Sequence, residues 1–238
     1  MEFVVRSKEL SLGRYDTDKI ANGYLDRYDS FLYPLVSRDV KVLEIGVRAG
    51  GSLLLWRDYF PKGVIVGVDV ALPDGLSGED RIQIFRGSQE DTAFLSEVAL
   101  KTAPEGFDLI IDDASHIGEL TKVAFWHLFD NHLKPSGLYV IEDWGTGYWD
   151  DWPDGRSFQP EPPWRSLGLR LLRKLTLVRE APWANHNYGM VGFVKELVDE
   201  QGAADLTQAR MSGVPARTSR FEKMVITPSI VFITKSAR

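Results

Sequence analysis

Two apolar segments that end in acidic residues constrain the fold of this chain more than any other feature. They are residues 107–113 (FDLIIDD) and residues 138–143 (LYVIED). The residues between them have helical spacing and then a Lys-Pro-Ser-Gly turn, which predicts a strand, a helix and a second strand. Neighbouring parallel strands carry functional groups at their carboxyl ends. We therefore expect the four carboxylates of these segments, and His116 just after the first, to share one crevice. Carboxylates this close repel one another unless a cation lies among them, so the pattern predicts a bound divalent metal ion.

The preceding chain reads as the first half of a nucleoside-binding α/β fold. Residues 40–47 and 64–70 are apolar, β-branched runs typical of buried strands, and a glycine turn and a short helix lie between them. Residues 81–87 alternate like a third strand. Strands that alternate with helices predict a parallel sheet with right-handed crossovers. Residues 220–235 read as two strands around a Thr-Pro-Ser turn, which would add an antiparallel strand.

The glycine turn bears on which nucleoside cofactor would bind. A dinucleotide site favours Gly-x-Gly-x-x-Gly, whereas here Gly46 is followed by Val47 and Arg48. Glu44, inside a buried strand, needs a partner. S-adenosylmethionine has two cationic groups and no phosphate, so it suits Glu44 and Gly46. The alternative for Glu44 is a salt-bridged core acid.

Further cofactor contacts are expected at the ends of the second and third strands. Asp69 is placed to accept the two ribose hydroxyls, although it could instead be a capping or loop acid. Ser88 and Gln89 follow the third strand and are placed to reach the adenine. Taken in this order, the residues favour cofactor binding over the structural alternatives.

Two segments lie outside this pattern. Residues 1–38 predict a helical N-terminal segment that covers a sheet edge, or that brings Tyr15, Asp18 and Lys19 to the active site. Residues 145–188 form an aromatic-rich insertion, which we expect to be a lid or substrate-binding segment of a single domain spanning residues 1–238. The insertion contains a basic, leucine-rich helix (165–179), whose basic residues fit a solvated face, with contact to an anionic part of a larger substrate or to a lipid surface as alternatives. The candidate substrate contacts in it are Trp149, Trp152 and Trp164, though a loop pinned by its own aromatics or a dimer contact is equally consistent with them.

Composition excludes several classes of protein. The net charge of −6 gives no basic surface for nucleic acid, and the absence of cysteine excludes disulfides and thiolate sites. The N-terminus lacks a signal-peptide pattern, and no apolar run is long enough to span a bilayer, so we expect a cytoplasmic protein.

The motifs together resemble those of class I S-adenosylmethionine-dependent methyltransferases, and more closely those of the metal-dependent sugar O-methyltransferases typified by the macrocin and mycinamicin enzymes. The motifs that carry this resemblance are DTDK (16–19) with Tyr24 downstream, LEIGVRAGGS with Trp56, GVDV, IDDASH, LKPSGLYVIEDW and the terminal hairpin. The resemblance implies a Rossmann-like α/β fold whose seven-stranded, mostly parallel sheet has an antiparallel last strand. It also implies Mg²⁺ ligation by Asp113, Glu142 and Asp143, with His116 as the general base. Asp112 would face the methionine part of the cofactor or cap the following helix.

The expected activity is methyl transfer from S-adenosylmethionine to a hydroxyl of a sugar-containing small molecule or oligosaccharide, in a homo-oligomer, with a dimer expected. A catechol-type O-methyltransferase is the nearest rival. A non-catalytic cofactor-binding protein would not need the clustered acids. An iron-dependent hydroxylase fits poorly, because its metal triad needs two histidines and one carboxylate.

Overall fold

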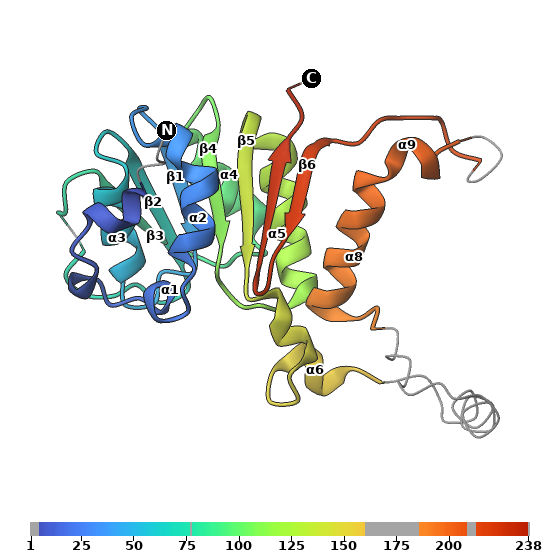
Figure 1. Ribbon diagram of the computed structural model, residues 1–238, viewed down its shortest axis with the longest axis horizontal. Coiled ribbons are helices and arrows are strands. Elements are labelled where there is room, and N and C mark those ends of the chain that lie inside the picture. The colour runs from blue at the N-terminus through green and yellow to red at the C-terminus, as the bar shows by residue number, and fades with distance from the viewer. Residues whose placement is uncertain (1–4, 77, 160–185, 209–212, 238) are drawn as a thin grey trace.

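A seven-stranded sheet forms the centre of the protein (Figure 1). The computed structural model describes residues 5–76, 78–159, 186–208 and 213–237. The strands are β1 (Lys41–Ile45), β2 (Val64–Asp69), β3 (Ile82–Arg86), β4 (Phe107–Asp112), β5 (Leu133–Glu142), β6 (Phe221–Ile226) and β7 (Ile230–Lys235). Their order is β3-β2-β1-β4-β5-β7-β6; β7 pairs antiparallel with β5 and with β6, and the other neighbouring pairs are parallel. The predicted seven-stranded sheet with an antiparallel last strand is confirmed.

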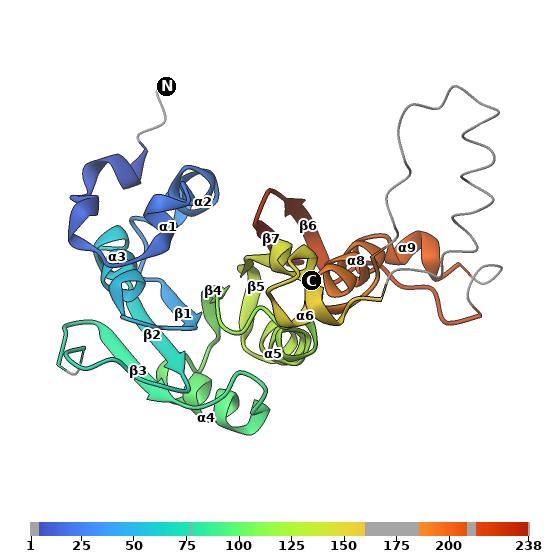
Figure 2. The ribbon, with the colours of Figure 1, turned by 90° about the horizontal axis from the view of Figure 1, so that it is seen from below.

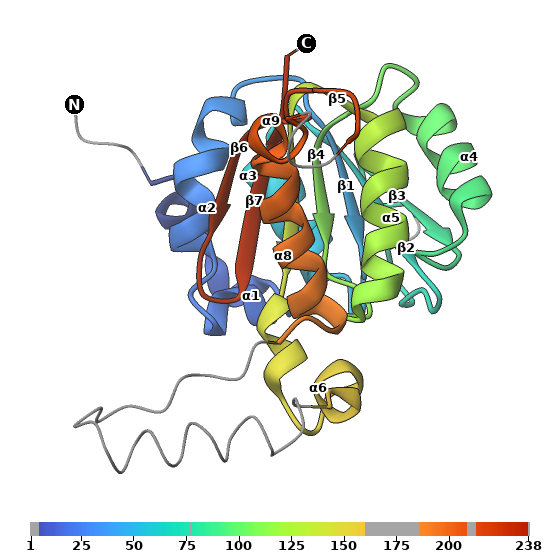
Figure 3. The ribbon, with the colours of Figure 1, turned by 90° about the vertical axis from the view of Figure 1, so that its right-hand side faces the viewer.

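Helices cover both faces of the sheet (Figures 2 and 3). One face carries α1 (Asp18–Ala21), α2 (Leu25–Leu32) and α3 (Gly51–Tyr59), and the other carries α4 (Thr92–Thr102), α5 (Gly118–Asn131) and α8 (Gly189–Gln201). Short helices α6 (Pro153–Ser157) and α9 (Ala203–Leu206) lie outside these layers. Of the helices within the described residues, none combines the length and apolar character that crossing a bilayer requires.

The side chains of each strand alternate between two apolar cores. In β5, Tyr139 and Ile141 pack toward α5 and α8, whereas Leu138 and Val140 pack toward α2 and α3. The same alternation turns Glu142 toward α2. In β1, Glu44 likewise faces α3. Both acidic side chains therefore enter the core on the face that the N-terminal segment covers.

The N-terminal segment is helical but broken. The sequence spacing suggested one amphipathic helix, and the structure instead has α1 and α2 separated at Asn22-Gly23. Gly23 has a φ of +65°, a conformation that interrupts a right-handed helix at little cost only for glycine. The break turns the chain so that α1 lies at the carboxyl ends of the strands, beside the site, while α2 packs on the sheet (Figure 1).

The aromatic insertion is described only in part. It begins with a 3-10 helix, η4 (Trp144–Tyr148), and continues into α6. Trp164 and the predicted basic helix 165–179 lie outside the described residues. The division of the chain into a single domain with a lid stays a prediction.

Candidate functional site

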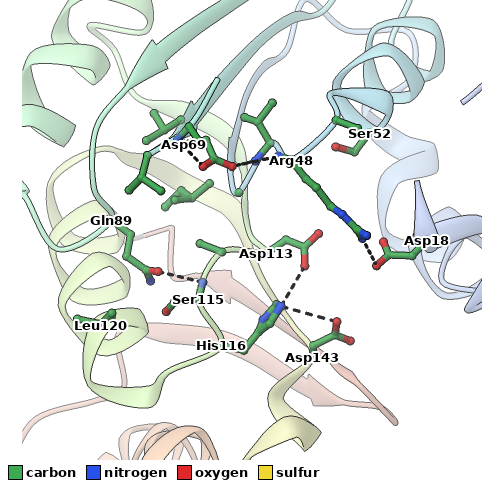
Figure 4. A pocket seen from close by; sticks show the side chains of 18 of the residues that line it. Asp18, Arg48, Ser52, Asp69, Gln89, Asp113, Ser115, His116, Leu120 and Asp143 are labelled. Atoms are coloured by element: carbon green, nitrogen blue, oxygen red, sulfur yellow. Dashed lines mark hydrogen bonds and ion pairs between the residues drawn. The ribbon is translucent and has the colours of Figure 1, made fainter. Parts of the chain in front are cut away.

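A cavity of about 1200 Å³ opens at the carboxyl ends of the parallel strands. Its wall combines the loops after β1, β2, β3 and β4 with residues from the N-terminal segment and the aromatic insertion. This is the edge of a parallel sheet where ligands bind in folds of this type. Figure 4 shows the polar side chains that converge on it.

Gly46 allows the loop after β1 to contact the loop after β4 at this cavity. Its φ is +95°, and a β-carbon at this position would lie 2.1 Å from the backbone oxygen of Asp113. The backbone N–H of Asp113 also donates to the carbonyl of Ile45, at 2.9 Å. A side chain at position 46 would therefore push the loop after β4, which carries Asp113, away from the loop after β1.

Asp69, the predicted ribose contact, lines the cavity at the end of β2. One of its carboxylate oxygens accepts the backbone N–H groups of Val47 and Arg48, at 2.7 and 3.0 Å, and the other accepts that of Ala71, at 3.0 Å. These bonds fix the carboxylate at the rim of the cavity (Figure 4). Three of the roughly four lone-pair sites of the carboxylate are thus used, and the free site lies on the oxygen that accepts the Ala71 N–H, where a hydroxyl could donate.

Ser88 and Gln89 also line the cavity, as predicted from the sequence. The Gln89 side-chain oxygen accepts the backbone N–H of Ser115, at 3.1 Å. Its amide nitrogen is buried and has no hydrogen-bond partner among the described residues. An unused buried donor costs free energy unless a ligand satisfies it, so Gln89 fits an adenine edge.

Glu44 does not line the cavity. Its fully buried carboxylate accepts hydrogen bonds from the Ser52 hydroxyl at 2.7 Å and the Trp56 indole N–H at 3.3 Å, and it pairs with Lys19 at 3.3 Å. This arrangement differs from the predicted direct cofactor contact. It matches the other alternative, the salt-bridged core acid, because the strand alternation turns Glu44 inward under α3.

Asp113 and Asp143 form the candidate metal centre, and His116, the predicted general base, lies beside them. One ligand atom from each lies within 4.8 Å of the others, and all three residues are partly exposed to the cavity. The His116 Nε2 lies 3.8 Å from Asp113 and 3.9 Å from Asp143 (Figure 4). His116 and Asp143 have positive φ values of 52° and 51°, and strained backbone of this kind clusters at functional sites.

Glu142, the third predicted ligand, is held by protein groups. Its carboxylate is fully buried, accepts the Tyr28 hydroxyl and pairs with the Lys19 ammonium at 2.9 Å. Burial, reinforced by Asp113, raises the pKa of Glu142 well above its ordinary value, although Lys19 opposes the shift. The single ammonium of Lys19 pairs with three carboxylates, Glu44, Asp113 and Glu142, so an additional cation beside Asp113 and Asp143 would offset the remaining negative charge.

Asp112 faces away from the cavity. It is buried, and its carboxylate accepts the Tyr139 hydroxyl at 3.2 Å. Burial raises its pKa to about 7. Asp112 does not cap α5, because Ile117 holds the N-cap position of that helix. Its contact with the methionine end of the cofactor stays a prediction.

The predicted substrate contacts divide into two groups. Trp149 and Trp152 line the cavity, and the Trp152 ring lies 5.7 Å from that of His116. Tyr15 is turned away: it is nearly buried, and its hydroxyl donates to Asp58 at 2.8 Å in a separate surface depression. Its position in a 3-10 turn before α1 explains the difference, because the chain reaches the cavity only from Asp16 onward.

The roles of several residues that organise the site were not predicted from the sequence. Tyr24 donates its hydroxyl to Asp143, and Tyr28 does so to Glu142, so each of these acids has a tyrosine partner from the N-terminal segment. Asp154 accepts the backbone N–H groups of Gly118 and Met190, at 2.8 and 2.7 Å, and so ties the insertion to α5 and α8. Tyr24 belongs to the motifs that carry the family resemblance, but both tyrosines occur at helical spacing and read as core residues, so the sequence assigned no role to their hydroxyls.

Known proteins share both sequence and structure with this chain, although no protein-family model matches it. The mycinamicin VI 2''-O-methyltransferase of Micromonospora griseorubida is 39% identical over 170 residues, which is 68% of this chain and 41% of that protein. The demethylmacrocin O-methyltransferase of Streptomyces fradiae is 38% identical over 153 residues, 61% of this chain and 38% of that protein. The chain thus spans less than half the length of these relatives.

A solved structure agrees with the sequence relatives. The MycE methyltransferase of the mycinamycin biosynthetic pathway, in complex with Mg and SAH, matches with a TM-score of 0.66 and 30% identity. The match covers 89% of this chain and 48% of MycE. A further MycE complex, which also contains mycinamycin VI, matches with a TM-score of 0.62 and 28% identity, covering 90% of this chain and 49% of that one. The chain is therefore a homologue of the macrocin- and mycinamicin-type sugar O-methyltransferases and has the fold of a class I S-adenosylmethionine-dependent methyltransferase.

Proposed function

We propose that this chain is an S-adenosylmethionine- and Mg²⁺-dependent O-methyltransferase that acts on a sugar hydroxyl. The observation that carries the proposal is the single cavity that brings Asp69 and Gln89 together with Asp113, His116 and Asp143. The relatives named after sugar O-methylation support the acceptor class, and the Mg and SAH in MycE support both ligands. The homo-oligomer and the cytoplasmic location stay predictions from the sequence.

The cofactor would occupy the side of the cavity nearer β2 and β3. Asp69 would accept the ribose hydroxyls, Ser88 and Gln89 would contact the adenine, and Gly46 would leave room for the cofactor's methionine end. Methyl transfer from a sulfonium is an in-line displacement, so holding donor and acceptor in register accounts for much of the acceleration.

The acceptor hydroxyl would lie between the metal side and the aromatic wall. Asp113 and Asp143 would hold Mg²⁺, with Glu142 behind them, and bound Mg²⁺ would lower the pKa of the acceptor hydroxyl and orient it. The Nε2 of His116 would accept the hydroxyl proton as the oxygen attacks the methyl carbon. Trp149 and Trp152 would stack on the apolar face of a sugar ring and exclude water from the reacting groups.

Calorimetry and an acceptor screen test this proposal. The chain should bind S-adenosylmethionine, and Asp69→Asn should bind it more weakly because an amide is a poorer acceptor for two hydroxyls. Labelled S-adenosylmethionine should then transfer its methyl group to a glycoside from a panel that also contains catechols, with the methyl position located by mass spectrometry. Absence of cofactor binding would refute the function, and exclusive methylation of catechols would replace the sugar by a planar diol.

A further inference from the structure

Lys19 is buried behind the cavity, and the reaction as described above assigns it no role. Its side chain is fully buried among Glu44, Asp113 and Glu142. We propose that Lys19 is a positioning residue whose ammonium anchors the cofactor-cavity wall formed by residues 16–22 and orients Asp113 toward the metal ion. The inference rests on the proposed function, since it assigns Lys19 a part in holding both ligands.

The three acidic partners match the bonding capacity of an ammonium. The Nζ of Lys19 lies 2.5 Å from Asp113 Oδ2, 2.9 Å from Glu142 Oε1 and 3.3 Å from Glu44 Oε1. A lysine ammonium has three N–H donors and no acceptor, so one donor is available for each carboxylate. A buried ammonium is costly unless it is paired in this way, which holds Lys19 at one place.

The acids that receive Lys19 are themselves fixed. Glu44 is bonded to Ser52 and Trp56 of α3, and Glu142 is bonded to the Tyr28 hydroxyl of α2. Glu44 belongs to β1 and Glu142 to β5, so Lys19 joins two strands that have β4 between them. The ammonium is thus attached to a rigid frame rather than to mobile surface groups.

One consequence concerns the cavity wall. Asp16, Thr17, Asp18 and Asn22 all line the cofactor cavity, and Lys19 lies among them in sequence. The backbone of Asp16 packs closely on Gly51: a β-carbon at Gly51 would lie 2.1 Å from the backbone oxygen of Asp16. The buried attachments of this wall are the Gly51 contact and the Lys19 ammonium, and an exposed ion pair joins Asp18 to Arg48 at 3.6 Å. Because an exposed pair contributes little, loss of the ammonium would loosen the α1 end of the wall.

The other consequence concerns Asp113. Its Oδ2 receives the Lys19 ammonium, while its Oδ1 lies 3.8 Å from the His116 Nε2 on the cavity side. Because Lys19 holds one oxygen toward the core, the other is presented to the metal centre. Without the ammonium, the carboxylate can rotate and present a different arrangement of oxygens to a bound ion.

Lys19→Met tests the proposal, with Lys122→Met as the matched control. Lys122 pairs with Glu196 on the exposed surface between α5 and α8, so its replacement removes a cation outside the site. Calorimetry with S-adenosylhomocysteine in EDTA measures cofactor affinity without a bound metal ion, and so reports on the cavity wall alone. For Lys19→Met we expect the dissociation constant of S-adenosylhomocysteine to rise at least about tenfold. The control should stay within about twofold of wild type, as for a surface pair.

Paramagnetic resonance of bound Mn²⁺ tests the orientation of Asp113. The spectrum should differ from wild type in Lys19→Met and not in Lys122→Met, a change that a purely structural lysine would not cause. Because removing one partner from a buried ionic cluster can unfold a protein, Lys19→Met/Glu44→Gln removes a cation and an anion together and should give the same two results.

The outcomes separate this inference from the proposed function. A wild-type chain that binds neither S-adenosylhomocysteine nor Mn²⁺ would refute the proposed function itself. Wild-type binding of both, with unchanged affinity and an unchanged spectrum in a folded Lys19→Met or double variant, would overturn the role of Lys19 alone.

Discussion

Replacement of Gly46 by alanine is the sharpest test of how the two halves of the site meet. The φ of +95° at Gly46 would cost an alanine about 1–2 kcal/mol. Its β-carbon would lie 2.1 Å from the Asp113 oxygen. Overpacking of this kind adds about 1–3 kcal/mol, because two packed loops must separate. We therefore expect Gly46→Ala to lower the free energy of unfolding by about 2–5 kcal/mol.

Gly75 provides a matched control. Its φ is +92°, almost the value at Gly46, but a β-carbon there would meet no atom within 4 Å. Gly75→Ala should therefore carry only the backbone cost of about 1–2 kcal/mol. The difference between the two variants isolates the contact between Gly46 and Asp113.

Urea unfolding followed by tryptophan fluorescence gives both free energies, and Mn²⁺ binding reports the metal side. Displacement of Asp113 should weaken Mn²⁺ binding in Gly46→Ala and leave it unchanged in Gly75→Ala. Equal losses of stability in the two variants, together with unchanged Mn²⁺ affinity in Gly46→Ala, would refute the claim that this glycine sets the distance between the two loops.

Three further substitutions test other parts of the account. His116→Ala should lower kcat by about 100-fold or more, because the proposed general base is lost. The dissociation constant of S-adenosylmethionine should change little, and full activity would mean that another group removes the proton. Tyr28→Phe removes a hydroxyl donor to the buried Glu142 and should cost about 1–3 kcal/mol in urea unfolding; an unaltered midpoint would mean that the bond contributes nothing. Burial alone would raise the pKa of Glu200, but hydrogen bonds from Arg217 and Arg220 outweigh it and lower the pKa to about 2. A lowered pKa stabilises the folded state above the unfolded value near 4.5, and the stabilisation is lost as the pH falls from there to about 2. Glu200→Gln should therefore lower the free energy of unfolding by about 1–2 kcal/mol at pH 7, a figure reduced because both arginines are partly exposed. The difference in stability from wild type should shrink below pH 4.5, and a difference that does not depend on pH would contradict this reasoning.

The sheet could be predicted because its central strands β1, β2, β4 and β5 are largely buried on both faces. Such strands read as continuous apolar runs, and each one ends where polar or acidic residues begin. The terminal hairpin was marked in the same way by its Thr-Pro-Ser turn between residues 226 and 230. The parallel order then followed from the alternation of strands with helices, so the common edge of the site was predictable as well.

Residue roles were less predictable, because they depend on contacts between distant parts of the chain. Glu44 could be read as a cofactor ligand or as a core acid, and only the approach of Lys19, which comes from a separate segment, selects the second. Lys19 was expected near the site, but its three partners come from β1, β5 and the loop after β4. Tyr15 was expected beside it, and a 3-10 turn directs it to Asp58 instead.

The requirement for a metal ion is the part of the account that one measurement tests most directly. With a glycoside acceptor identified, transfer of labelled methyl from S-adenosylmethionine should be measured in excess EDTA and again after Mg²⁺ is restored. The account predicts that EDTA abolishes transfer and that Mg²⁺ recovers it, because Asp113 and Asp143 line the acceptor side of the cavity. Undiminished transfer in EDTA would contradict the central claim that these acids hold a catalytic metal ion.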